Sequence, residues 1–180
     1  MRRENAQKAR QAADQLFPGE KWQKIEAGIY RSPRRPIGKR SNYQNELRDA
    51  QILRDLGGTV YLAPEQSRCS GRKFDAIVNG LNFEFKNVGG NENTLAAHFL
   101  YSRSQAPNVF LNLETSNLTR HEVMGALYSA RNSVTHTDQK GNIIKGYADY
   151  NRFAGGMIIL KLREHDSLIY LKVDNLKARR

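Results

Sequence analysis

The chain has 180 residues, and its 29 Lys and Arg against 18 Asp and Glu give a formal net charge of +11. Hydrophobic residues make up 39% of it, which is enough for one packed core and too little for a second independent one. No stretch reaches the roughly 18 apolar residues of a membrane span, and the charged N-terminus lacks the apolar core of a signal peptide. We therefore expect a cytoplasmic protein that does not contact a membrane.

The cysteine content and the charge narrow the classes of function further. Cys69 is the single cysteine, which excludes an intramolecular disulfide and a zinc site built from several cysteines. The excess of positive charge indicates a polyanionic partner, of which nucleic acid is the commonest. Charge alone does not distinguish a protein that binds nucleic acid from one that cleaves it.

The first forty residues differ in pattern from the rest of the chain. Residues 2–16 are rich in helix formers and predict a helix, which Pro18-Gly19 interrupts. A second short helical stretch is expected around Trp22 and Ile25. Residues 31–40 (RSPRRPIGKR) follow as a basic linker or arm, either solvated or in contact with phosphate. We predict a basic helical N-terminal extension over residues 1–40 and a globular domain over residues 41–180.

The second region begins with a helix, a strand and a hairpin. Ser41 is a suitable cap for a helix that ends near Leu56, before Gly57-Gly58. Residues 59–63 (TVYLA) predict a short strand. Residues 73–88 alternate in the manner of two strands around Asn79-Gly80, the preferred pair for a two-residue hairpin turn.

The remaining elements complete an alternating pattern. A helix capped by Asn93 or Thr94 runs to about Ser104, and residues 108–113 (NVFLNL) form an apolar strand. Another helix begins at Thr119. After a polar stretch, residues 155–162 and 167–173 predict an antiparallel pair of strands. This order of elements is typical of a mixed α/β (α+β) domain with a central mixed sheet flanked by helices.

The hairpin carries the most informative group of side chains. Residues two apart in a strand face the same side, so Glu84 and Lys86 project together. A turn at Asn79-Gly80 places Asp75 almost opposite Glu84. Facing carboxylates repel each other, and a divalent cation between them would remove that conflict.

Magnesium fits such a group, although Mn²⁺ or another divalent metal is an alternative. Mg²⁺ takes oxygen ligands, so Asp75, Glu84 and the Phe85 carbonyl form a suitable set. Lys86 is placed to orient or deprotonate an attacking water, or to stabilise charge on a phosphate. Glu46, on the preceding helix, is a candidate third acid, for which Asp49 and Asp55 are alternatives. Without a metal, the same acids would be ordinary polar strand and helix residues.

The order of Glu46 on a helix, then Asp75, then Glu84-x-Lys86 resembles the PD-(D/E)XK nuclease superfamily. Phe74 stands where that superfamily has a proline, which is not a ligand. The resemblance covers residues 41 to 113. It implies a restriction-endonuclease-like core and a metal-dependent nuclease in which Glu46, Asp75, Glu84 and Lys86 are catalytic.

Residues 102–109 (SRSQAPNV) are similar to a pattern in the C-terminal nuclease toxin domains of contact-dependent growth inhibition systems. By that resemblance, Arg103 and Gln105 would contact substrate phosphate. Such toxins include transfer-RNA nucleases and DNases, and a cognate immunity protein neutralises them. The initial Met1 leaves open whether this is an excised toxin domain or a free-standing protein.

The loop before Asp75 and the histidines are less informative. Arg68, Arg72 and Lys73 would meet an approaching phosphodiester, or simply keep the loop soluble. The histidines lack metal-ligand spacing and are expected at the surface or in the core; they are His98, His121, His136 and His165.

We therefore predict a Mg²⁺-dependent endonuclease. The resemblance to toxin domains implies a bacterial toxin that acts on tRNA in the cytoplasm of a target cell, with DNA as second choice. One alternative is a non-catalytic nucleic-acid-binding protein of phage or mobile-element origin. The other is a basic adaptor that binds an acidic protein partner.

Overall fold

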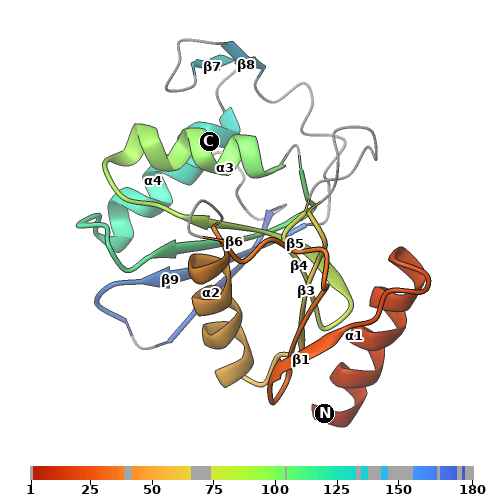
Figure 1. Cartoon of the computed structure of the whole chain (residues 1–180). Helices are drawn as coiled ribbons and strands as arrows, with labels where there is room; N and C mark the ends of the chain where they lie inside the picture. The colour runs from red at the N-terminus through yellow and green to blue at the C-terminus, as the bar shows by residue number, and fades with distance from the viewer. Residues whose placement is uncertain are drawn as a thin grey trace. The chain divides into compact units, whose positions relative to one another are not determined.

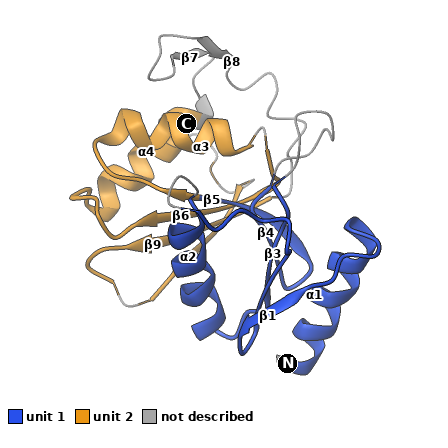
Figure 2. Cartoon of the chain, in the orientation of Figure 1, with its two compact units in different colours: residues 1–85 blue, residues 86–180 orange. Residues whose placement is uncertain are grey.

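The computed structural model describes residues 2–38, 42–65, 74–103, 105–132, 135–137, 143–145, 156–165, 167–173 and 176. The chain divides into two compact units, residues 1–85 and residues 86–180 (Figure 2). The boundary that the sequence predicts after residue 40 stays a prediction.

The first unit begins with helix α1 (Arg2–Leu16), which confirms the first predicted helix. Its fully buried Ala9 and Ala13 lie one turn apart, so a narrow face of small side chains packs against strands β3 and β4. The outward face carries the i,i+4 ion pairs Lys8–Glu4 and Arg10–Asp14.

The predicted helical stretch around Trp22 and Ile25 is wrong, because strand β1 (Gln23–Glu26) occupies these residues. β1 pairs antiparallel with β2 (Ile29–Arg31) through a turn in which Gly28 has a φ of 81°. Trp22 packs edge-on against Phe17 and Tyr61, at centroid distances of 5.9 and 5.1 Å. Aromatic packing across the unit thus overrides the weak local preference for a helix.

Helix α2 (Tyr43–Asp55) and strand β3 (Val60–Leu62) follow as predicted, joined by Gly57 with a φ of 89°. The predicted cap, Ser41, lies outside the described residues. β3 is buried along its length and pairs in parallel with β2. The Ser32 N–H continues this pairing by donating to the Leu62 carbonyl.

The predicted hairpin is confirmed as strands β4 (Ala76–Val78) and β5 (Leu81–Asn87). The turn residues Asn79 and Gly80 both have positive φ, 50° and 90°, as a tight hairpin turn requires. β4 also pairs antiparallel with β3, so the strand order here is β1-β2-β3-β4-β5 with both parallel and antiparallel neighbours.

The second unit contains helix α3 (Glu92–Arg103), strand β6 (Asn108–Leu113) and helix α4 (Arg120–Asn132), all near their predicted positions (Figure 1). Strand β9 (Met157–Leu162) pairs in parallel with β6 and antiparallel with β10 (Ile169–Lys172), which confirms the predicted final pair. Two short strands that the sequence did not predict, β7 (Thr135–Thr137) and β8 (Ile143–Lys145), pair antiparallel.

Side-chain caps set the starts of both helices in this unit. The Asn91 carboxamide accepts from the Thr94 N–H, so the cap lies two residues before the earliest predicted position. Thr119 and Glu122 bond reciprocally in a capping box at the start of α4. The helices pack on a core that includes Leu95, Phe99, Leu111, Val123, Leu127, Ile158 and Leu160.

Parallel and antiparallel pairings combined with covering helices confirm the mixed α/β class. Among the described helices, none is both long enough and apolar enough to cross a bilayer.

Candidate active site

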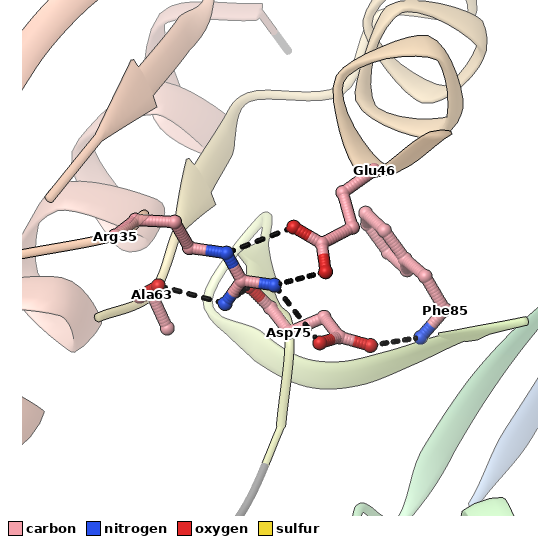
Figure 3. Close-up of polar contacts among 5 residues, drawn as sticks. All are labelled: Arg35, Glu46, Ala63, Asp75 and Phe85. Atoms are coloured by element: carbon pink, nitrogen blue, oxygen red, sulfur yellow. Dashed lines mark hydrogen bonds and ion pairs between the residues drawn. The ribbon is translucent and has the colours of Figure 1, made fainter. Parts of the chain in front are cut away.

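The first unit holds a cluster of buried charge that joins two of the predicted catalytic acids through an arginine. Figure 3 shows the Arg35 guanidinium between the carboxylates of Glu46 and Asp75. Arg35 Nε donates to Glu46 Oε2 at 2.8 Å, and Nη2 lies 2.5 Å from Glu46 Oε1 and 3.0 Å from Asp75 Oδ1. Both carboxylates therefore converge on one nitrogen atom.

Arg35 reaches this position from the segment that the sequence indicated as a basic linker or arm. After Ser32 extends the β2–β3 pairing, the chain turns, and the Arg35 N–H donates to the Ser32 carbonyl at 3.0 Å. The Arg35 side chain is only 7% exposed, and its Nη1 donates to the Ala63 carbonyl at 2.8 Å. The alternative of a solvated arm, which the sequence analysis left open, is therefore wrong at Arg35.

Glu46 belongs to the site because of its place on α2. Tyr43, Ala50 and Leu53 are buried, and Glu46 lies three residues after the first and four before the second, on the same helical face. Its side chain is accordingly only 12% exposed. Asp55 and Asp49 were the predicted alternatives to Glu46. The Asp55 side chain is 66% exposed and pairs with Arg54, whereas Asp49 is fully buried.

Asp75 lies just before the hairpin ladder rather than within it. The ladder continues to Ala76 opposite Phe83, but the Asp75 N–H donates to the Phe83 carbonyl instead of pairing with Glu84. Asp75 Oδ2 accepts from the Phe85 N–H at 2.9 Å, which leaves Oδ1 to Arg35. The main chain of the predicted ligand Phe85 thus orients the Asp75 carboxylate.

The charges in the cluster favour the ionised arginine. Burial by itself would lower the pKa of Arg35, but the neighbouring carboxylates of Glu46 and Asp75 outweigh it and raise this pKa above its ordinary value. The guanidinium therefore remains protonated, and the two acids keep a cation between them.

Glu84 is buried, at 2% exposure, although the alternation of the strand predicts that only Phe83 and Phe85 face inward. Both faces of β5 are therefore covered at this point. Lys86, two positions further along β5 and the first residue of the second unit, lies with its Nζ 5.7 Å from the centre of the Tyr101 ring.

His98 lies on α3 near Lys86 and is expected to stay neutral at physiological pH. Burial, and secondly the positive charge of Lys86, lower the pKa of its imidazole. Because unfolded His98 takes up a proton that folded His98 resists, the stability of the second unit should fall as the pH drops below about 6.5.

Lys86→Gln should raise the pKa of His98, and Lys172→Gln should leave it unchanged. NMR titration of the imidazole resonances measures this; an unshifted pKa in Lys86→Gln would contradict it.

The predicted phosphate contacts have different surroundings. Arg103 is 2% exposed and donates to the Pro107 carbonyl, and a Cβ on Gly156 would overlap both groups. This close packing connects α3 to the sheet. Gln105, half-buried, donates its backbone N–H to Ser102 at 2.9 Å. Arg68, Arg72 and Lys73 lie outside the described residues. The role of all five in substrate binding stays a prediction.

The cluster suits a cation. Carboxylate and carbonyl oxygens are the ligands of Mg²⁺, and those of Glu46, Asp75 and Ala63 already surround the positive charge of Arg35. Within the described ranges, no three His, Cys, Asp or Glu side chains are grouped to hold a metal ion. A metal would therefore be held by Glu46 and Asp75, and the role of Glu84 as a further ligand stays a prediction.

No protein family and no curated protein matches the sequence. Among solved structures, this chain is similar to a chain of the "CdiA-CT/CdiI toxin and immunity complex from Burkholderia pseudomallei", with a TM-score of 0.51 and 19% sequence identity. The similarity covers 80% of this chain and 98% of that chain. At this identity the comparison shows a similar fold.

Proposed function

We propose that the chain is a metal-dependent nuclease toxin that cleaves tRNA, with DNA as the second candidate substrate. The observation that carries the proposal is the convergence of Glu46 and Asp75 on one cation position in the first unit. Two carboxylates that meet at one cation are the minimum set for a magnesium site that also uses substrate oxygens.

The fold comparison and the charge support the toxin assignment. The similar solved structure contains a toxin and an immunity protein, and a net charge of +11 suits a protein that acts on a polyanion. We propose that the chain acts in the cytoplasm of a target cell and that a cognate immunity protein blocks it.

We propose the following roles for the predicted site residues. Glu46 and Asp75 would bind Mg²⁺, and Glu84 and the Phe85 carbonyl are the predicted further ligands. The Phe85 N–H orients Asp75. Bound Mg²⁺ would supply positive charge to activate a water and to stabilise charge on the scissile phosphate. Lys86 would orient that water, and the basic residues Arg68, Arg72 and Lys73 would hold the substrate backbone.

Cleavage assays test the proposal. Purified protein is incubated with total tRNA, plasmid DNA and single-stranded DNA, with Mg²⁺ or Mn²⁺ and with a chelator. We expect metal-dependent fragments, chiefly from tRNA. If no substrate is cut with any divalent metal, the proposed activity is wrong.

A non-catalytic nucleic-acid-binding protein is the second candidate, and one observation favours it. Arg35 already neutralises part of the charge of Glu46 and Asp75, which is what purely structural acids would require. That candidate predicts salt-sensitive binding of nucleic acid with no cleavage and no effect of a chelator. Binding to an acidic protein but not to nucleic acid would instead indicate an adaptor.

A further inference from the structure

Arg35 occupies the position at which the proposed metal would bind. Its guanidinium donates to both carboxylates through Nε and Nη2, and to the Ala63 carbonyl through Nη1 (Figure 3). These acceptors are the oxygen types that Mg²⁺ takes as ligands.

The two cations cannot share this position. Mg²⁺ lies about 2.1 Å from its ligand oxygens, and Arg35 Nη2 already lies 2.5 Å from Glu46 Oε1 and 3.0 Å from Asp75 Oδ1. A metal on the same oxygens would bring two positive charges into contact in a largely buried place, where repulsion is poorly screened. Binding of the metal therefore requires the guanidinium to move.

The location of Arg35 in the chain permits that movement. Its side chain extends from a turn after β2, not from a helix or a strand, and the neighbouring Arg34 and Ile37 side chains are largely exposed. Rotation about the side-chain bonds moves the guanidinium without disturbing the β2–β3 pairing. Glu46 and Asp75 stay in place because α2 and the Phe85 N–H hold them.

We infer that Arg35 and the divalent metal are alternative occupants of the Glu46–Asp75 pair, and that binding of the metal displaces the Arg35 guanidinium. The inference rests on the proposed metal-dependent function. In the metal-free protein, Arg35 is a positioning residue that holds two mutually repelling carboxylates together. After displacement, the same guanidinium is beside the site and can pair with two oxygens of a substrate phosphodiester, as the geometry of arginine favours.

A resonance of the wild-type protein tests the displacement directly. The Arg35 Nε–H donates to Glu46 in a buried place, so it should give a slowly exchanging signal in ¹⁵N NMR, assigned by its loss in Arg35→Lys. Titration with MgCl₂ should shift or remove this signal with saturation. A signal that stays unchanged at Mg²⁺ concentrations that support cleavage would overturn the inference while leaving the proposed function intact.

Metal affinity gives an independent measurement. Arg35→Met removes the competing cation, and isothermal titration with MnCl₂ should show a Kd about tenfold lower than that of the wild type, because the competent site is no longer occupied. Arg34→Met is the matched control, since it removes the same charge from a 64% exposed neighbour, and its Kd should remain near the wild-type value.

The outcomes separate the two claims. If Arg35→Met binds Mn²⁺ no more tightly than the wild type or Arg34→Met does, the displacement is wrong and the nuclease proposal stands. If neither the wild type nor Arg35→Met binds a divalent metal and the wild type cuts no substrate, the proposed function fails and the inference fails with it. Should Arg35→Met not fold, the wild-type NMR titration decides the question.

Discussion

Asp75→Asn is expected to lower metal-dependent cleavage by about 10³-fold while substrate binding is retained, because several kcal/mol of transition-state stabilisation depend on the metal. The substitution removes the charge that attracts a cation. It keeps a side-chain oxygen that accepts from the Phe85 N–H, which orients Asp75 in the wild type. Initial rates of tRNA cleavage in Mg²⁺, compared with filter binding at the same salt concentration, measure the two effects separately.

Asp55→Asn is the matched control for this experiment. Asp55 is the last residue of α2, and its 66% exposed side chain pairs only with Arg54 among the contacts described. Its loss should leave cleavage near the wild-type rate, since exposed ion pairs contribute little. Undiminished cleavage by Asp75→Asn would exclude Asp75 as a metal ligand, whereas equal losses in both variants would indicate a general effect of charge.

The parts of the fold that depend on local pattern could be predicted from the sequence. The Asn79-Gly80 turn demands positive φ and set the hairpin register, and the apolar faces of α2, α3 and α4 indicated the helices. Strand β1 could not be predicted in this way. Its short sequence has weak preferences, and tertiary contacts stabilise it as a strand: antiparallel pairing with β2 and the packing of the preceding Trp22 on Phe17 and Tyr61.

The residues of the candidate site likewise divide into those that could be predicted from the sequence and those that could not. Glu46 could be proposed from the sequence because it is an acid on the helix before the hairpin, although Asp49 and Asp55 were alternatives. Its position on the same helical face as buried Tyr43 and Ala50 is evident only in the structure.

Arg35 could not be predicted from the sequence, because its partners lie 11 and 40 residues away in the chain, and a Pro-rich basic segment is typical of a solvated linker. The sequence predicted a conflict of charge between Asp75 and Glu84 that a cation would relieve, but the structure places Arg35 between Asp75 and Glu46 instead.

The Arg35 cluster should also dominate the stability of the first unit. Arg35→Ala is expected to lower the free energy of unfolding by about 3 kcal/mol, because it leaves two mainly buried carboxylates facing each other without a cation. This value is at the lower end of the loss of stability usual for a broken buried ion pair, since the Asp75 side chain remains 20% exposed. Trp22, the single tryptophan of the chain, belongs to this unit, so its fluorescence during urea unfolding in chelator measures the loss.

Two further variants identify the cause of that loss. Arg34→Ala removes an exposed guanidinium and should change the stability by less than about 1 kcal/mol. Adding Glu46→Gln to Arg35→Ala removes one of the two repelling charges and should restore part of the lost stability. The double variant should therefore be more stable than the sum of the two single losses predicts. Saturating Mg²⁺ should stabilise Arg35→Ala more than the wild type, because no arginine competes for the carboxylates. Losses that simply add in the double variant would show that Arg35 stabilises the unit through its packing rather than through its charge.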